Sequence, residues 1–177
     1  GAVTTGNNIT SAEGTIATGA LTISGDVIVS TTNQAITIGG AVEATNSGND
    51  ALTLAAGSAA TSVTGAIGAT TPLESLTVNG SGAVTLTSIG GGSSGVAGAT
   101  TVSGSSGGIT LNGGTYNTTG AQSYTGNVGV GADTTFTTDN GNLTFSGTFN
   151  GVVAARAITI SIGTGDVLFS NTVGNAI

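Results

Sequence analysis

Apolar and polar residues alternate along this chain in short units, most of which begin with glycine. The unit reads glycine, any residue, apolar, polar or small, apolar, as in Gly-Ala-Leu-Thr-Ile at residues 19–23. Glycine adopts the positive φ angles of tight turns at little steric cost, and the side chains of the extended chain that follows point to alternate sides. Each unit therefore predicts a turn followed by a short, half-buried strand. The unit recurs at residues 25–29, 82–86, 107–111, 126–130, 141–145 and 165–169 and, without its glycine, at 36–38, 52–54, 76–78 and 158–160.

The order of these units favours a coil over the sandwich or barrel that short, closely spaced strands also allow. The turn residue precedes each strand in the same way, and the apolar positions are mostly Val, Ile, Leu and Ala, which stack on themselves in successive rungs. We therefore predict an all-β parallel β-helix, or β-solenoid, over residues 1–177, with about eight rungs of ~20–25 residues and no significant helix. The middle threonines of the units are expected to face outward. These are Thr22, Thr37, Thr53, Thr77, Thr85, Thr144 and Thr159.

A longer repeat lies above the five-residue unit. Residues 9–68 are related to residues 109–174, with a period of about 100–106 residues. The clearest match pairs Ala-Leu-Thr-Leu at 51–54 with Ala-Ile-Thr-Ile at 157–160. Because the second copy stops part-way, we expect either a longer parent chain or a polymer in which the next copy continues. Residues 87–108 are rich in glycine and serine, and we expect a loosely held loop there.

Charge is scarce, and this restricts the classes of function. The chain has one arginine, no lysine, no histidine and eight acidic residues, for a net charge of -7. Such a chain repels phosphate backbones and anionic lipid surfaces, so we expect neither nucleic-acid binding nor membrane association. No apolar run approaches the ~20 residues that a membrane-spanning helix needs. The absence of cysteine excludes disulfides and thiolate sites, so the core must come from strand packing alone.

Several phrases resemble the repeats of very large bacterial surface proteins, the adhesin-like, filamentous-haemagglutinin-type β-solenoid exoproteins. They are Thr-Thr-Pro-Leu-Glu-Ser-Leu-Thr-Val at 70–78, Thr-Thr-Gly-Ala-Gln-Ser-Tyr at 118–124 and Gly-Ala-Asp-Thr-Thr-Phe at 131–136. The resemblance implies a secreted rod at the cell surface, associated with the outer membrane through parts not in this sequence. We accordingly predict a stiff, protease-resistant adhesin stalk, with a subunit of a self-assembling filament, sheath or surface layer as the alternative. The implied partners are other copies or neighbouring repeats, through end-to-end or lateral contacts, and host or biofilm glycans or surface proteins.

Candidate chemistry is sparse. Residues 163–168 approach the calcium-binding pattern Gly-Gly-x-Gly-x-Asp but are one residue short and not tandemly repeated. Asp26 and Asp166 are the candidate calcium ligands, although aspartates at turns more often accept hydrogen bonds from nearby amides. We therefore expect no metal and no cofactor. A polysaccharide-active β-helix enzyme would need paired carboxylates, and the acids here are scattered, so we expect no enzyme and predict no catalytic residue.

Two other hypotheses concern the surface of the molecule. Flat ladders of threonine on a regular solenoid allow an ice-binding function by fold-level analogy. Tyr116, Tyr124 and Phe149 are candidates either for sugar stacking or for packing at the rung corners. Arg156 is expected to face outward near an acidic residue.

Overall fold

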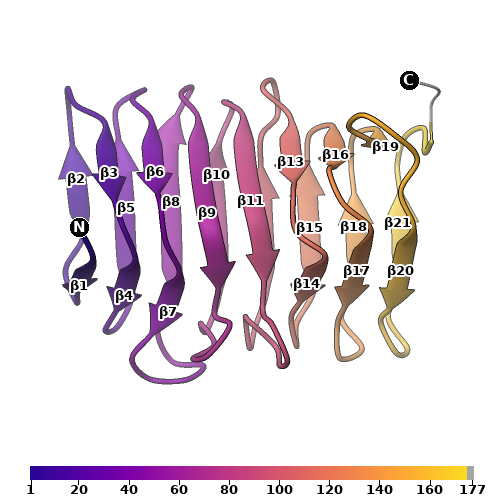
Figure 1. The fold of residues 1–177 in the computed structure, drawn as a ribbon, viewed down its shortest axis with the longest axis horizontal. Coiled ribbons are helices and arrows are strands. Elements are labelled where there is room, and N and C mark those ends of the chain that lie inside the picture. Colours follow the sequence, from indigo (N-terminus) through magenta and orange to yellow (C-terminus); the bar gives the residue numbers. More distant parts are fainter. Residues whose placement is uncertain (175–177) are drawn as a thin grey trace.

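A computed structural model describes residues 1–174 as a parallel β-solenoid of about seven turns (Figure 1). The strands lie across the long axis of the molecule, and each pairs in parallel with the equivalent strand of the next turn. Residues 1–174 contain no helix long and apolar enough to cross a bilayer. The predicted fold class and the predicted number of rungs are therefore confirmed.

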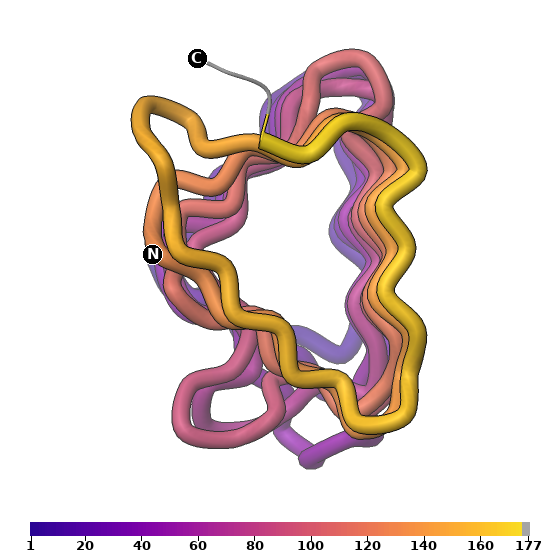
Figure 2. Tube along the Cα trace, turned by 90° about the vertical axis from the view of Figure 1, so that its right-hand side faces the viewer, coloured from indigo at the N-terminus to yellow at the C-terminus, as the bar shows by residue number. Residues whose placement is uncertain are grey.

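Each turn has three sides, and these surround one central core (Figure 2). One side is an eight-stranded sheet with one strand per rung, and a thirteen-stranded sheet covers the other two sides. The larger sheet bends around a corner within β9 (Thr61–Ile67). Residues 61–63 of β9 pair with β6, whereas Ile67 pairs with Val42 of β7.

The strands of the two sheets are as follows. The eight-stranded sheet contains β2 (Ile9–Ser11), β5 (Val27–Thr31), β8 (Leu52–Gly57), β10 (Leu76–Gly80), β12 (Thr100–Ser103), β15 (Gln122–Thr125), β18 (Leu143–Phe145) and β21 (Val167–Phe169). The thirteen-stranded sheet contains β1 (Val3–Thr5), β3 (Ile16–Thr18), β4 (Leu21–Ile23), β6 (Ile36–Ile38), β7 (Val42–Ala44), β9 (Thr61–Ile67), β11 (Val84–Ile89), β13 (Ile109–Leu111), β14 (Thr115–Asn117), β16 (Val128–Val130), β17 (Thr134–Thr137), β19 (Phe149–Gly151) and β20 (Ile158–Ser161).

The strand register places equivalent residues in columns along the rod. One inward column of the eight-stranded sheet holds Ile9, Val29, Leu54, Val78, Val102, Tyr124, Phe145 and Phe169, so successive turns are 20 to 25 residues long. The seven threonines expected to face outward are all exposed or half-exposed. They are divided among the three sides, because Thr22, Thr37 and Thr53 lie on β4, β6 and β8.

The core is one continuous apolar column whose composition changes along the rod. Aliphatic side chains fill the first five rungs, and aromatic side chains fill much of the last three. Tyr124 stacks on Phe145, and Phe145 stacks on Phe169, each pair with ring centroids 5.1 Å apart. Burying an aromatic or large aliphatic side chain contributes about 1.5–3 kcal/mol to the free energy of unfolding, so this core is the main source of stability.

The glycine- and serine-rich segment at residues 87–108 is tied into the stack. It contains β12, and both Val96 and Val102 are completely buried. Val96 bridges Leu73 of the preceding turn and Thr118 of the following turn. The wide corner is therefore anchored by apolar side chains that point back into the core.

Two asparagines fasten corners in the same way, although they lie on different corners. Asn33 and Asn140 both adopt left-handed backbone conformations, with φ of 58° and 62°. The Oδ1 atom of Asn33 accepts hydrogen bonds from the amide (2.9 Å) and hydroxyl (3.0 Å) of Ser58 in the next turn. Asn140 Oδ1 accepts the equivalent pair from Thr164, at 2.9 and 3.0 Å. Asn33 follows a strand of the eight-stranded sheet, whereas Asn140 precedes one.

The sequence repeat does not coincide with a whole number of turns. Residues 52–54 lie on β8 in the eight-stranded sheet, but the matching residues 158–160 lie on β20 in the thirteen-stranded sheet. Residues 9–11 and 109–111, on β2 and β13, are separated in the same manner. Similar stretches of sequence therefore occupy different sides of the coil.

Candidate functional site

The two candidate calcium ligands lie far apart along the rod. Asp26 immediately precedes β5 in the second rung, and Asp166 immediately precedes β21 in the last described rung. The Oδ1 atom of Asp26 accepts a hydrogen bond from the amide of Ala51 in the next turn, at 3.1 Å. The amide of Asp166 donates to Oδ1 of Asn142, at 2.9 Å. Residues 1–174 contain no group of three or more Asp, Glu, His or Cys side chains that could hold a metal ion.

Asp26 belongs to a set of side chains whose oxygen atoms accept hydrogen bonds from main-chain amides of the next turn. These contacts lie at corners, where the regular ladder between strands is interrupted. Each one adds an acceptor for an amide that the ladder leaves without one, so it holds two turns together. Besides Asp26, Asn33, Asn140 and Asn142, the set comprises Asn8 with Ile28, Glu43 with Thr71, Asn127 with Thr148 and Asp133 with Ala157, at 2.8 to 3.1 Å.

Asp50 is the most deeply buried acid among the described residues, with 2% of its surface exposed. Its carboxylate accepts hydrogen bonds from the amides of Gly25 (2.7 Å), Thr45 (2.9 Å) and Asn46 (2.8 Å), and from the Thr45 hydroxyl (3.1 Å). Burial alone would raise the pKa of this carboxyl, but the hydrogen bonds from Asn46, Gly25 and Thr45 outweigh it and hold the pKa below its ordinary value. Asp50 therefore closes the corner loop at residues 45–50 and joins it to the previous turn. Nothing in the sequence indicates this role, because Gly25 comes close to Asp50 only when the chain coils.

The three aromatic candidates for sugar stacking are buried. Tyr116 and Tyr124 are fully inaccessible, and Phe149 is 3% exposed. The Tyr116 hydroxyl donates to the carbonyl oxygens of Leu86 and Thr87, at 3.1 and 3.0 Å. Burial raises the pKa of both tyrosines above the ordinary value. Of the two alternatives for these rings, the structure therefore favours packing over sugar stacking, because all three side chains are part of the core.

A polar network lies inside the aromatic part of the core. Gln122 occupies an inward column between Thr100 and Leu143. Its Nε2 atom donates to the carbonyl oxygens of Tyr116 and Thr137, both at 2.9 Å, and its Oε1 atom accepts from the Tyr124 hydroxyl at 2.9 Å. All these groups are satisfied within the protein, which is typical of a structural network rather than a reactive one.

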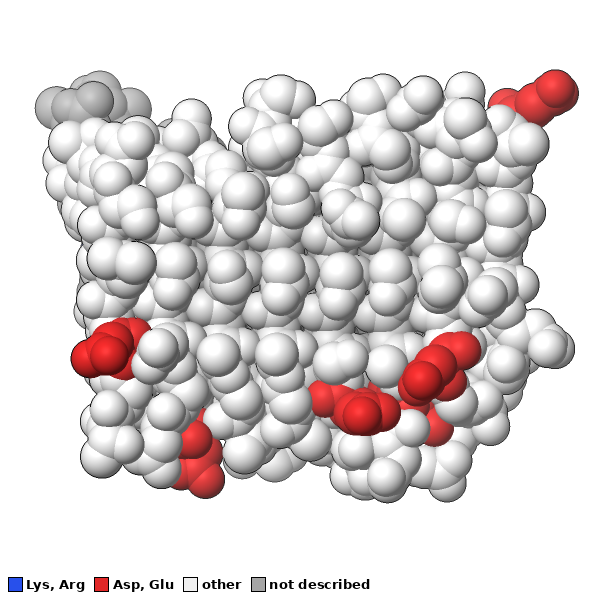
Figure 3. All heavy atoms as spheres, turned by 180° about the vertical axis from the view of Figure 1, so that it is seen from behind, with Lys and Arg blue, Asp and Glu red and all other residues white. Residues whose placement is uncertain are grey.

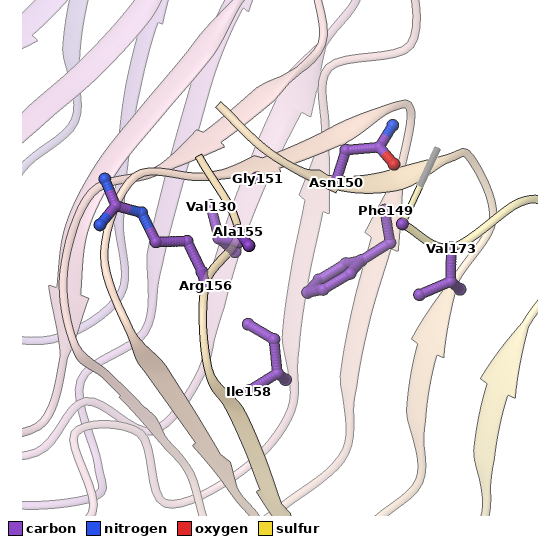
Figure 4. A pocket seen from close by; sticks show the side chains of 9 residues that line it. Val130, Phe149, Asn150, Gly151, Ala155, Arg156, Ile158 and Val173 are labelled. Atoms are coloured by element: carbon purple, nitrogen blue, oxygen red, sulfur yellow. The ribbon is translucent and has the colours of Figure 1, made fainter. Parts of the chain in front are cut away.

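One small cavity lies at the corner beneath the loop at residues 152–157. Its volume is about 190 Å³, and Val130, Phe149, Ile158 and Val173 line its apolar wall (Figure 4). Arg156 contributes part of its stem to the wall, while its guanidinium group points away from Phe149 and Ile158 (Figure 4). Arg156 forms no ion pair with an acid in the part of the chain that the structure describes, and its Nε atom has no hydrogen-bond partner.

The outer face of the eight-stranded sheet carries a regular arrangement of side chains. Seen from behind, it shows rows of similar side chains, with most of the acidic atoms toward the lower edge and one acidic group at the upper right corner (Figure 3). Its central outward column carries short, uncharged side chains between two larger apolar ones. From the second rung to the last, this column is Ile28, Thr53, Thr77, Thr101, Ser123, Thr144 and Leu168.

Comparison of the chain with protein-family models, with curated proteins and with solved structures finds no significant match. The fold therefore defines the class. The chain is a repeat protein of the parallel β-solenoid type, and a set of polar side chains at its corners connects one turn to the next.

Proposed function

We propose that this chain is a non-enzymatic structural segment, a stiff rod in the extracellular stalk of a bacterial surface adhesin. The observation that carries the proposal is the continuity of the stack. Parallel pairing and the apolar core run from the first rung to the last without a break. The resemblance of residues 70–78, 118–124 and 131–136 to surface-exoprotein repeats supports the same role.

The energetics favour a rod that resists unfolding. An internal turn can open only by losing main-chain hydrogen bonds to both neighbouring turns and by exposing its share of the core. Corner acceptors such as Asp26 and Asn33 add contacts where the ladder is weakest. Proteases act on locally unfolded chain, so these features also support survival outside the cell.

The surface supports an extracellular role as well. Thr, Ser and Asn cover it in place of the usual lysine and glutamate, and the net charge of -7 makes parallel rods repel one another. A stalk requires this combination of stiffness and weak lateral attraction.

Immunogold electron microscopy of source cells with antibodies raised against the 177-residue polypeptide tests the proposal. We expect label on fibres that project beyond the cell envelope, and none with serum pre-absorbed on the polypeptide. Label confined to the cell interior would contradict the stalk.

The flat outer face of the eight-stranded sheet favours a second candidate function, the ordering of water at an ice surface. Its outward column repeats every rung, at a spacing of ~4.8 Å, and presents a hydroxyl at each of five successive rungs, those of Thr53, Thr77, Thr101, Ser123 and Thr144. The test is thermal hysteresis, the gap between melting and freezing temperatures. Ice binding predicts hysteresis that Thr77→Tyr and Thr101→Tyr abolish and that Thr85→Tyr, on another side of the coil, leaves intact. Absence of hysteresis in the unaltered chain excludes this candidate.

A further inference from the structure

The outer face of the eight-stranded sheet carries almost no charge. Its central outward column, described above, is flanked by one further outward column on each side. The column that precedes it along the strands is Asp26, Ala51, Ser75, Ala99, Ala121, Asn142 and Asp166. The column that follows it includes Thr10, Ser30, Ala55, Asn79, Ser103 and Thr125. Among the described residues of these three columns, only Asp26 and Asp166 are charged, and they lie near opposite ends of the face.

The size and composition of this face match those of a weak protein–protein interface. Most of its side chains are short, so two such faces can approach closely and pack their methyl groups together. Ile28 adds a large apolar side chain that is 43% exposed. The rungs from Ile28 to Leu168 lie ~4.8 Å apart, and about five outer residues at ~3.3 Å span each strand, so a pair of faces would bury about 1,000 Å² in total. That area is close to the lower limit for a specific interface.

The two aspartates distinguish between the two ways in which this face can pair with a second copy about a two-fold axis. If the rods were antiparallel, the column of Asp26 would lie against itself in reverse order, so Asp26 would face Asp166 of the second copy at both ends of the contact. If the rods are parallel, this column faces the column of Ser30, and both aspartates face short, uncharged side chains. Like charges that face each other across an interface are unfavourable, so charge favours the parallel arrangement.

We propose that two copies of this chain pair side by side through this face, with their rods parallel. Each residue of the central column then faces the same residue of the second copy, and the facing threonines pack their methyl groups and exchange hydrogen bonds. The contact joins identical surfaces and closes on itself. The acidic groups outside the face remain on the outer sides of the pair and repel further copies, so association stops at a dimer. A stalk built in this way is a double rod.

Sedimentation equilibrium of the 177-residue polypeptide tests the pairing. We expect dimers that dissociate on dilution, and no larger species. Thr101→Asp places two carboxylates opposite each other in the pair, so the dimer dissociation constant should rise at least ~10-fold. Thr85→Asp adds the same charge at a half-exposed position of β11, on another side of the coil, and is expected to pair like the unaltered chain. Both variants should keep the β-rich circular dichroism of the unaltered chain.

Chemical cross-linking tests the direction of the rods. The chain contains no cysteine, so an introduced thiol reports only on its own neighbour. In the parallel pair Thr53 faces Thr53 of the second copy, so Thr53→Cys alone should give covalent dimers with a short bis-maleimide. In an antiparallel pair Thr53 would face Thr144, and covalent dimers would require a mixture of Thr53→Cys and Thr144→Cys. Thr85→Cys is the matched control and is expected to give none.

The proposal is overturned if the unaltered chain is monomeric at every concentration, which would leave the face to solvent or ice. It is also overturned if Thr101→Asp pairs as tightly as the unaltered chain, or if Thr85→Asp weakens pairing to the same extent. Cross-linking only in the mixture of Thr53→Cys and Thr144→Cys would reject the parallel arrangement. Monomers with a β-rich spectrum reject the pair and keep the rod, so this outcome is distinct from a failure of the proposed stalk.

Discussion

Two buried threonines differ in whether their hydroxyl groups have partners. Thr100 is 1% exposed, and its Oγ1 atom has no hydrogen-bond partner. Thr134 is 2% exposed, and its Oγ1 atom donates to the carbonyl oxygens of Ala132 and Gly113, at 2.8 and 3.2 Å. A buried polar atom without a partner reduces the free energy of unfolding, whereas a satisfied one contributes to it.

Replacement by valine should therefore have opposite effects at the two positions. We expect Thr100→Val to raise the free energy of unfolding by about 1 kcal/mol and Thr134→Val to lower it by a similar amount. Denaturant midpoints for the two variants and the unaltered chain measure the difference. Equal destabilisation at both positions would show that the Thr100 hydroxyl has a partner after all.

Asp50 should make the rod sensitive to acid. Its pKa lies below the ordinary value of 3.8 in the folded chain, so its contribution is present above that pH and is lost as the pH falls through the folded pKa. We expect Asp50→Asn to lower the free energy of unfolding by about 2 kcal/mol at neutral pH and to weaken its decline in acid. Unfolding midpoints between about pH 6 and pH 2 provide the measurement. Glu13→Gln, at an exposed position, is the control, and an equal effect there would contradict the assigned role of Asp50.

At the scale of single residues, the sequence predicts which side chains face the core but not which residues they contact. Alternation correctly places Leu143 and Phe145 inward and Thr144 outward. It could not show that Gln122 continues an otherwise largely apolar column, because a polar residue at an inward position breaks the pattern from which sides are read. Its partners Tyr116 and Thr137 belong to separate strands, and only the register brings them together.

At the scale of strands and corners, the corners limit how closely two successive turns can approach each other. A Cβ atom at Gly113 would lie 1.5 Å from the carbonyl oxygen of Thr87 in the preceding turn, which is main chain and cannot move aside cheaply. We expect Gly113→Ala to lower the free energy of unfolding by about 3 kcal/mol. Gly92→Ala is the matched control, because a Cβ there meets nothing within 4 Å, and its thermal midpoint should barely change. Similar losses in both variants would point to backbone entropy rather than contact as the cause.

Strands are easier to predict from this sequence than their places on the coil. A glycine followed by an apolar pair defines a strand such as β16 because the alternation is local. The side that the strand occupies depends on the number of corners before it, and corners range from a few residues to the long segment between β11 and β12. For this reason Thr101 was not recognised as a neighbour of Thr77, although the two occupy one outward column.

The whole molecule has a single basic residue, which allows a simple test of rigidity. Arg156 follows four exposed residues in the loop at 152–155, where Val153 is 73% exposed. We expect trypsin to cut the native chain once, after Arg156, while residues 1–156 keep their β-rich circular dichroism. Mass spectrometry of the products identifies the cut. Chymotrypsin serves as a comparison, because five of the six aromatic side chains are buried, and rapid cleavage at Tyr116 or Tyr124 would contradict a stable core.

The sequence also leaves the surface chemistry of the whole rod undetermined. Composition excludes a thiolate site, yet the flat outer face of the eight-stranded sheet arises only when the turns are stacked. The separation of Asp26 from Asp166 is likewise a property of the stack, since both follow a glycine in nearly identical units.

The corner contacts of Asn33 and Asn140 have a consequence for how such rods change in length during evolution. The same asparagine contact closes a corner after the eight-stranded sheet in one place and before it in another, so one kind of corner serves two positions on the coil. A duplication or deletion could therefore add or remove one strand with its corner, without completing a circuit. Each such event would rotate everything beyond it by one side about the axis. Loops of common ancestry would then point in different directions around the rod. The length of the rod and the directions of its loops could evolve independently.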